Sequence, residues 1–400
     1  MAKYTLYGDG IHDDTDAIQE MIDSGSCEVA LPAPVDHYLI SRTLLLPSNF
    51  RLCLPRFARI RLADGANCLM LQNRLSRDRA ERVSEKLFDF VNEFSDREMC
   101  QNIEIVGGVW DFNNRGQNPN PLQTHVYEPP GYTGIGMVFY RVRGLRLSAL
   151  TLKDPVNFAV TLDTVSYFTV EDIVFDFNHG NPNATNMDGI HCDGNCHFGH
   201  LRNLQGACYD DLIALNADEG TGGPITHIDV DGIYCEDCHS AARLLTVKYP
   251  VEHIHLTNIH GTFYQYCIGI TKFYKGESEG YYDGITLDNI YASKAERIPV
   301  YGKSPTSYVY PIIYIENSLH VKNLHIHDLH RREYINPVET LHVGWETTVD
   351  HLVLRNITSE NHTDADRVPM WVNHGKVNVT AQDIYEDGEP VAIVSNGERV

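Results

Sequence analysis

Short stretches in which apolar and polar residues alternate recur along the chain from about residue 100 onward. Examples are residues 167–174, 225–233, 251–259 and 282–290. Alternation with a period of two is typical of β-strands, because successive side chains of a strand point to opposite faces. Each of these stretches has an Asn or Asp one or two residues before its closing apolar residue, which is Ile173, Ile233, Ile259 or Ile290. We therefore expect two short strands that meet at a polar corner.

The spacing of these stretches indicates a repeat. Their closing apolar residues recur about every 30 residues, with insertions; they are Ile173, Leu204, Ile233, Ile259, Ile290, Leu329, Ile357 and Ile384. A second family of short strands lies between them, for example residues 189–192, 211–215 and 243–247. Strand repeats of this length predict an all-β fold, a right-handed parallel β-helix, in which each repeat forms one coil of a solenoid.

Alternation also predicts which side chains of the second family point toward the core. The inward set is Ile190, Cys192, Ile213, Leu215, Leu245 and Val247. The residues between them are expected to face solvent; they include His191, Ala214 and Thr246. Parallel stacking places equivalent positions of neighbouring coils at the spacing of a sheet, roughly 4.8 Å.

The chain reads as a single domain, residues 1–400, because no interdomain linker is visible. Residues 1–30 include an N-terminal segment, 13–23, with capping residues and apolar positions at helical spacing. We expect this helix to cover the open end of the solenoid. Residues 74–98 are charged and lack alternation, which predicts a helical or loop excursion, and residues 100–400 form the central and C-terminal coils.

Charge and composition exclude several classes of partner. The formal net charge is −22, which argues against nucleic acid and makes a long polyanion an awkward substrate. No apolar run approaches the length of a membrane span, so no membrane contact is expected. The N-terminus lacks the apolar core of a signal peptide, which predicts a cytoplasmic protein with reduced cysteines. Self-association is left open.

Three carboxylates fall at one phase of two successive repeats. Asn186 and Asp188 open one strand, and Asp210 and Asp211 open the next. Aligning the strands by their inward residues stacks Asp188 on Asp211, with Asp210 one residue back. Carboxylates this close cannot all ionise cheaply, so one pKa should rise and provide a proton donor. The competing interpretation is ordinary turn chemistry, because Asp, Asn and Gly favour turns.

These motifs resemble those of glycoside hydrolase family 28, the polygalacturonase family. Residues 8–18, GDGIHDDTDAI, look like the N-terminal cap of that family and of other pectin-lyase-like β-helices. Residues 103–111 are similar to the family's entry into the central coils. The Asn-x-Asp motif matches residues 186–188, and the Asp-Asp pair matches Asp210 and Asp211. For fold, the resemblance covers nearly the whole chain.

The resemblance implies roles for the three carboxylates. Asp210 would be the general acid, and Asp188 and Asp211 would hold and activate a water, giving inversion in a single displacement. No cofactor and no metal are implied. An enzyme that meets short imported fragments inside the cell would be exo-acting.

The sequence departs from the family at three places. Tyr209 stands where the family has Gly before the Asp-Asp pair. The Gly-His-Gly of the next coil is replaced by residues 239–243, HSAAR. The Arg-x-Lys that grips a uronate carboxylate is replaced by residues 270–272, of which Lys272 alone matches. These departures leave the sugar open, because a fold does not determine a function.

Other polar residues of the same columns are candidates for binding sugar hydroxyls. They are Asn186, His191, Asp193, Asn216, Asp218, His239, Arg243, Lys248 and Lys272. The leading hypothesis is a glycoside hydrolase that acts on a plant- or microbe-derived oligosaccharide. The alternatives are a polysaccharide lyase, an epimerase or a glycosyl or fructosyl transferase on the same scaffold, and a carbohydrate-binding protein without activity.

Overall fold

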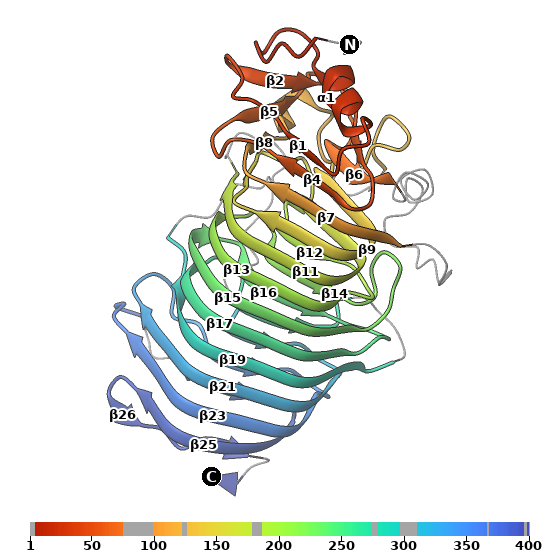
Figure 1. Cartoon of the computed structure of the whole chain (residues 1–400). Helices are drawn as coiled ribbons and strands as arrows, with labels where there is room; N and C mark the ends of the chain where they lie inside the picture. Colours follow the sequence, from red (N-terminus) through yellow and green to blue (C-terminus); the bar gives the residue numbers. More distant parts are fainter. Residues whose placement is uncertain are drawn as a thin grey trace.

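The computed structural model describes residues 5–74, 99–121, 126–177, 186–273, 278–296, 310–365, 368–395 and 398–399. Parallel strands wind into a right-handed parallel β-helix that runs from the N-terminal end to the C-terminal end (Figure 1). This confirms the predicted fold class. The charged excursion expected at residues 74–98 lies outside the described residues, apart from Arg74.

The strands form three faces. The first face contains β1 (Glu28–Ala30), β4 (Phe50–Cys53), β7 (Cys100–Val106), β9 (Met137–Ser148), β11 (Val160–Asp176), β13 (His197–Ala207), β15 (Ile225–Cys238), β17 (Val251–Phe263), β19 (Gly280–Lys294), β21 (Leu319–Glu333), β23 (Thr348–Asn361) and β25 (Lys376–Glu386). In the N-terminal coils the second face contains β2 (His37–Ile40), β5 (Arg59–Leu62), β8 (Val109–Asp111) and β10 (Thr151–Lys153). The later long strands of the first face bend into this second face.

The third face, called the site face below, carries the candidate chemistry. It contains β3 (Leu44–Leu46), β6 (Leu71–Asn73), β12 (Ile190–Cys192), β14 (Asp211–Asn216), β16 (Ser240–Leu245), β18 (Ile268–Thr271), β20 (Ile313–Ile315), β22 (Leu341–Val343) and β24 (Trp371–Asn373). The first residues of β9 and β11 continue it. The remaining elements are a short 3-10 helix (Asn114–Gly116) and β26 (Glu389–Pro390), β27 (Val394–Ser395) and β28 (Glu398–Arg399).

The closing apolar residues of the repeats form one column through the core. Ile173 lies beside Leu204, Leu204 beside Ile233, and the register continues to Ile384. Each side chain of the column is buried. The predicted repeat is thus confirmed strand by strand, because the burial of one apolar column fixes the register of the whole stack.

The polar corner before this column has a left-handed backbone. The φ angles of Asn203, Asn258 and Asn289 are 52°, 57° and 52°. Asn and Asp tolerate this conformation better than other residues with a Cβ, because their short polar side chains bond locally. The Nδ2 of Asn258 donates to Asp231 at 2.5 Å, and that of Asn289 donates to Asn258 at 2.6 Å. The strands β17 and β19 therefore turn from the first face into the second at a hydrogen-bonded asparagine, whereas β15 turns at Gly232, with φ of 89°.

The N-terminal end is covered by the predicted helix, α1 (Thr15–Ile22), which packs Ile18 and Ile22 onto the first coil (Figure 1). The buried carboxylate of Asp14 accepts the backbone N–H groups of Tyr7 at 2.6 Å and Leu39 at 3.2 Å. It joins the segment before the helix to β2. Among the described residues, no helix has the length and apolar character needed to cross a lipid bilayer.

Two expectations for the site face are wrong. Leu215 lies beside Leu244, so Leu244 occupies the inward column predicted for Leu245, and Arg243 lies beside Ala214. The side chains of His191, Ala214 and Thr246, expected to face solvent, are buried. Both errors have one cause: this part of the site face is buried on both sides. Apolar residues therefore occupy successive positions of the strands, and alternation no longer shows which side chains point toward the core.

Candidate functional site

The pairing of β12 with β14 brings the three carboxylates together. Ile190 lies beside Ile213 and Cys192 beside Leu215. The same register places Asp188 level with Asp211, and the N–H of Gly189 donates to the carbonyl of Asp211 at 3.0 Å. The stacking of Asp188 on Asp211 follows from this register.

Asp211 is held inside the fold. Its side chain is fully buried; Ser240 Oγ donates to one carboxylate oxygen, and Arg243 Nε lies 2.8 Å from the other. Ser240 is level with Asp211 on the next coil, where β14 pairs with β16. Asp211 therefore forms an ion pair with Arg243 from a fully buried position and accepts a hydrogen bond from Ser240.

Asp210 lies at the edge of the site face, with 21% of its side chain exposed. The register that aligns Asp211 with Ser240 also brings His239 next to Asp210. His239 Nδ1 lies 3.6 Å from Asp210 Oδ1 and 3.9 Å from Asp211 Oδ1. Asp210 is thus the carboxylate of the Asp-Asp pair that a ligand can reach.

Asp188 is oriented by a buried imidazole. His191 Nδ1 lies 2.6 Å from Asp188 Oδ2, and on the other side His191 Nε2 lies 2.9 Å from Glu219 Oε2 and 3.3 Å from Asp193 Oδ1. The ring of Phe158 stacks on the imidazole, with centroids 4.0 Å apart. The three carboxylates raise the pKa of His191 well above its usual value against the opposing effect of burial.

The environments of the carboxyl groups displace their pKa values. Burial raises the pKa of Asp188 to about 8, and the negative charge of Asp210 adds to this rise. Burial also raises the pKa of Asp211, although the Arg243 guanidinium opposes that rise. A carboxyl group that keeps its proton at neutral pH is one requirement for acid and base chemistry between neighbouring carboxyl groups.

Asp188 and Asp210 line the same pocket, called the site pocket here. Its volume is about 560 Å³, which is within the range of small-ligand sites. The residues that line it are Phe158, Asn186, Asp188, Asp210, Glu219, His239, Arg243, Gln265, Tyr266, Thr271, Phe273, Tyr310, Tyr314 and Glu316. They come from several successive coils, so the pocket runs along the site face.

The structure divides the predicted binding residues into three groups. Asn186, His239 and Arg243 line the site pocket. His191, Asp193 and Asn216 are buried beside it; Asn216 donates to Glu219 at 3.0 Å. The third group, Asp218, Lys248 and Lys272, is not among the lining residues.

Two members of the third group have other contacts. The carboxylate of Asp218 accepts the backbone N–H groups of Val247 at 2.5 Å and Lys248 at 3.0 Å, so it closes the turn after β16. The ammonium of Lys248 lies 5.0 Å from the centre of the Tyr249 ring. Asp218 therefore has a structural role, because its oxygens bind backbone and not the pocket.

Several lining residues escaped the sequence analysis. Glu219 follows β14, Tyr314 lies on β20, and Tyr310 and Glu316 lie on either side of that strand. A long insertion separates β18 from β20, and the phase of the repeat cannot be counted across it. The sequence did offer one local signal for Tyr314, which is the short apolar stretch that contains it. In the structure this stretch is a strand on which Tyr314 is in register with Gly269 and His342.

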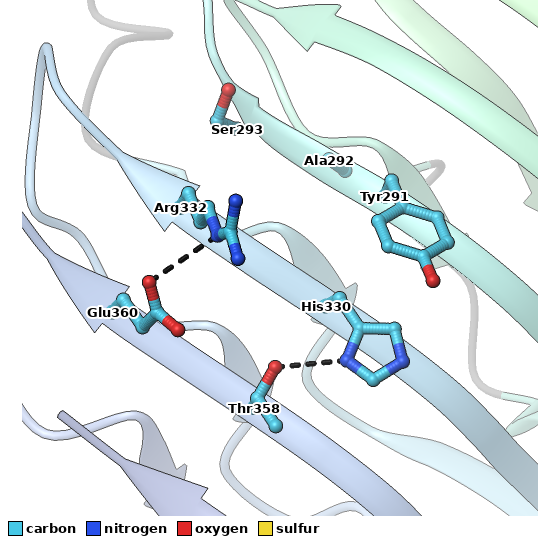
Figure 2. A pocket seen from close by; sticks show the side chains of 7 residues that line it. All are labelled: Tyr291, Ala292, Ser293, His330, Arg332, Thr358 and Glu360. Atoms are coloured by element: carbon cyan, nitrogen blue, oxygen red, sulfur yellow. Dashed lines mark hydrogen bonds and ion pairs between the residues drawn. The ribbon is translucent and has the colours of Figure 1, made fainter. Parts of the chain in front are cut away.

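A second hollow, of about 450 Å³, lies on β19, β21 and β23, and Figure 2 shows its side chains on these three strands. Glu360 is the one carboxylate among its described lining residues, and its Oε2 lies 3.3 Å from Nε of Arg332. His330 and Thr358 bond to each other at 2.8 Å. This hollow therefore has no second carboxyl group among its described lining residues.

Two clusters have ligand atoms close enough together to hold a metal ion. Asp210, Asp211 and His239 offer such atoms within 4.8 Å of one another at the site pocket. His191, Asp193 and Glu219 form the other cluster, which is buried. The first cluster has the oxygen and nitrogen donors that divalent cations accept.

No protein-family model and no curated protein matches the sequence. Solved structures with the same fold do match. An exopolygalacturonase from Thermotoga maritima is 12% identical, with a TM-score of 0.59 over 98% of this chain and 92% of that one. The A-module of a mannuronan C-5 epimerase from Azotobacter vinelandii is 13% identical, with a TM-score of 0.61 over 96% and 97%.

A surface adhesin of Streptococcus pneumoniae is also similar, with 12% identity and a TM-score of 0.54 over 99% of this chain and 98% of that one. The three proteins share the parallel β-helix with this chain and differ from one another in what they do. The comparisons therefore establish the fold, and the likeness to glycoside hydrolase family 28 rests on the motifs around Asp188 and Asp210.

Proposed function

We propose that the protein is a glycoside hydrolase that cleaves an oligosaccharide in the site pocket. One observation carries the proposal: Asp188 and Asp210 line one pocket, and the environment of Asp188 raises its pKa to about 8. Two carboxyl groups that share a pocket and together retain a proton are what glycosidic cleavage needs. The similar solved structures, which include an exopolygalacturonase, support a scaffold suited to carbohydrates.

The proposed reaction is a single displacement. Asp210, the reachable member of the pair, gives its proton to the oxygen of the leaving sugar as the bond between that oxygen and the anomeric carbon breaks. Asp188, oriented by His191, takes a proton from the water that attacks the opposite side of the anomeric carbon. The proton retained at neutral pH is shared by the two interacting carboxyl groups, and the reaction starts from the state in which Asp210 carries it and Asp188 is ionised. Asp211 keeps Arg243 in place and does not itself face the substrate.

Removal of sugars from a chain end fits the dimensions of the pocket. A volume of about 560 Å³ is typical of a site that encloses a small ligand. Tyr266, Tyr310 and Tyr314 form part of its wall, and their rings offer apolar surface to a sugar. We therefore propose exo-action.

The test is a screen of plant and microbial oligosaccharides in which NMR follows the anomer that forms first. The proposal expects cleavage of at least one oligosaccharide, with the product released in the inverted configuration. Retention of configuration would contradict the single displacement. Binding of sugars with no cleavage across the screen would contradict the hydrolase and favour a binding protein.

One observation favours a second candidate, a lyase or epimerase acting on uronates. Asp210, Asp211 and His239 can together hold a divalent cation, and Arg243 lies beside Asp211. Such an enzyme would neutralise a uronate carboxylate with the cation before it removes the proton next to it. Products that absorb as unsaturated uronides, with activity lost on chelation, would support this candidate. Activity that survives chelation would favour the hydrolase.

A further inference from the structure

The site pocket carries more negative charge than acid and base chemistry requires. Besides Asp188 and Asp210, the carboxylates of Glu219 and Glu316 line it. Glu219 contacts the imidazole of His191 at 2.9 Å. Glu316 Oε2 accepts the backbone N–H groups of Lys272 at 2.7 Å and Phe273 at 3.0 Å. These two bonds fix the Glu316 carboxylate at the wall of the pocket.

The positive groups at the pocket are already engaged by the protein. Arg243 is the one Lys or Arg among the lining residues that the structure describes, and its Nε lies 2.8 Å from the buried Asp211. His191 is buried under Phe158 between three carboxylates. Among the described residues, the cations at the site thus compensate buried carboxylates, and Glu316 is bound by backbone N–H groups alone.

Next to Glu316 the pocket wall is a cluster of tyrosines. The rings of Tyr266 and Tyr314 are 6.0 Å apart and nearly parallel, and Tyr310 meets them edge-on at 5.9 and 5.1 Å. Burial and the Glu316 carboxylate raise the pKa of Tyr310 and Tyr314, so both phenols stay protonated. Neutral phenols and aromatic rings suit the hydroxyl groups and the C–H faces of a sugar without charge.

We propose that the site pocket binds an uncharged sugar, and that Glu316 rejects the carboxylate that a uronic acid would bring there. This rests on the proposed function and names its substrate class. A like charge placed against a fixed carboxylate in a partly enclosed site is unfavourable, which is how proteins exclude the wrong partner. The net charge of −22 also repels polyuronates at long range, which disfavours their binding further.

The experiment uses matched substrates. Each glycoside that the oligosaccharide screen finds cleaved is compared with the uronide of the same configuration, in which a carboxylate replaces the hydroxymethyl group. We expect kcat/KM to favour the neutral glycoside by roughly a hundredfold, the size of a charge repulsion across a partly screened pocket. Preference for the uronide would overturn the inference and leave the hydrolase intact. Failure to cleave any glycoside would overturn the hydrolase.

A charge-neutralising variant assigns the effect to one residue. Glu316→Gln keeps an oxygen that can accept the two backbone N–H groups, and it should reduce the preference for the neutral glycoside by about tenfold. The matched control is Glu360→Gln in the second hollow (Figure 2), which should leave the preference unchanged. An unchanged preference in Glu316→Gln would remove this role from Glu316.

Two measurements on the unaltered protein test the inference even if Glu316→Gln does not fold. Added salt should weaken the discrimination against the uronide, because it screens the repulsion. Calorimetry should detect binding of the free neutral sugar in preference to its uronic acid, even when no glycoside is cleaved. Equal binding of both sugars, at low and at high salt, would overturn the inference.

Discussion

At the scale of single residues, Asp188 and Asp210 show how surroundings divide two identical side chains between two tasks. Asp188 is buried against His191, and Asp210 is reachable beside His239. The sequence predicted that one pKa in this cluster would rise, and Asp188 is where the rise is largest among the carboxyl groups of the cluster whose shifts are resolved. Sequence alone could not identify it, because the burial of Asp188 depends on tertiary packing that the repeat pattern does not report.

The raised pKa of Asp188 predicts how stability depends on pH. Between pH 3.8 and about 8, the interacting carboxyl groups of Asp188 and Asp210 keep a proton in the folded protein that the unfolded chain releases. The free energy of unfolding therefore falls as pH rises through this window, by up to about 1.4 kcal/mol for each pH unit. Asp188→Asn should flatten this slope in urea unfolding measured at several pH values. Parallel curves for the two proteins would contradict the raised pKa.

Asp211 and Arg243 form a pair that is costly to break. Arg243→Met leaves the Asp211 carboxylate buried without its cation, and we expect a loss of about 3 kcal/mol in the free energy of unfolding. The exposed pair of Arg332 and Glu360 provides the control. Arg332→Met should cost less than about 1 kcal/mol. Equal costs for both variants in denaturant unfolding would show that the Arg243 pair does not support the fold.

At the scale of elements, the strands of the first face were predictable and those of the site face were predictable only in part. The strands that carry the column from Ile173 to Ile384 have one buried face and one exposed face. The alternation of apolar and polar residues in these strands therefore shows which side chains point toward the core. In β16 the residues Ala241, Ala242, Leu244 and Leu245 are all buried. The pattern of apolar residues in β16 therefore could not show that Arg243 lies next to Ala214.

The left-handed corners predict a graded response to substitution. Asn258 has φ of 57° and bonds to Asp231 and Asn289. Asn258→Ala should lower the free energy of unfolding by roughly 2 kcal/mol, because it loses these bonds and adds backbone strain. Asn258→Gly also loses these hydrogen bonds, but glycine adopts a positive φ without strain. Asn258→Gly should therefore lower the free energy of unfolding by less than Asn258→Ala does. A glycine variant less stable than the alanine variant would contradict the role of the corner.

At the scale of the whole molecule, the solenoid converts positions far apart in sequence into one site. Asp188, Asp210, His239 and Tyr314 come from four stretches of chain that the register aligns on one face. The first two were identifiable because short turns keep the repeat countable between β12 and β14. Tyr310 and Tyr314 were not identifiable, because the insertion before β20 interrupts that count. A solenoid tolerates such insertions, since each coil contacts its neighbours alone.

The central claim is that Asp210 and Asp188 act as acid and base in one pocket. The most direct test is kcat of Asp210→Asn and Asp188→Asn on a natural glycoside and on a glycosyl fluoride, whose leaving group needs no proton. Asp210→Asn should lose about 10³-fold on the glycoside and little on the fluoride, whereas Asp188→Asn should lose activity on both. Full activity of a correctly folded Asp210→Asn on the natural glycoside would contradict the account.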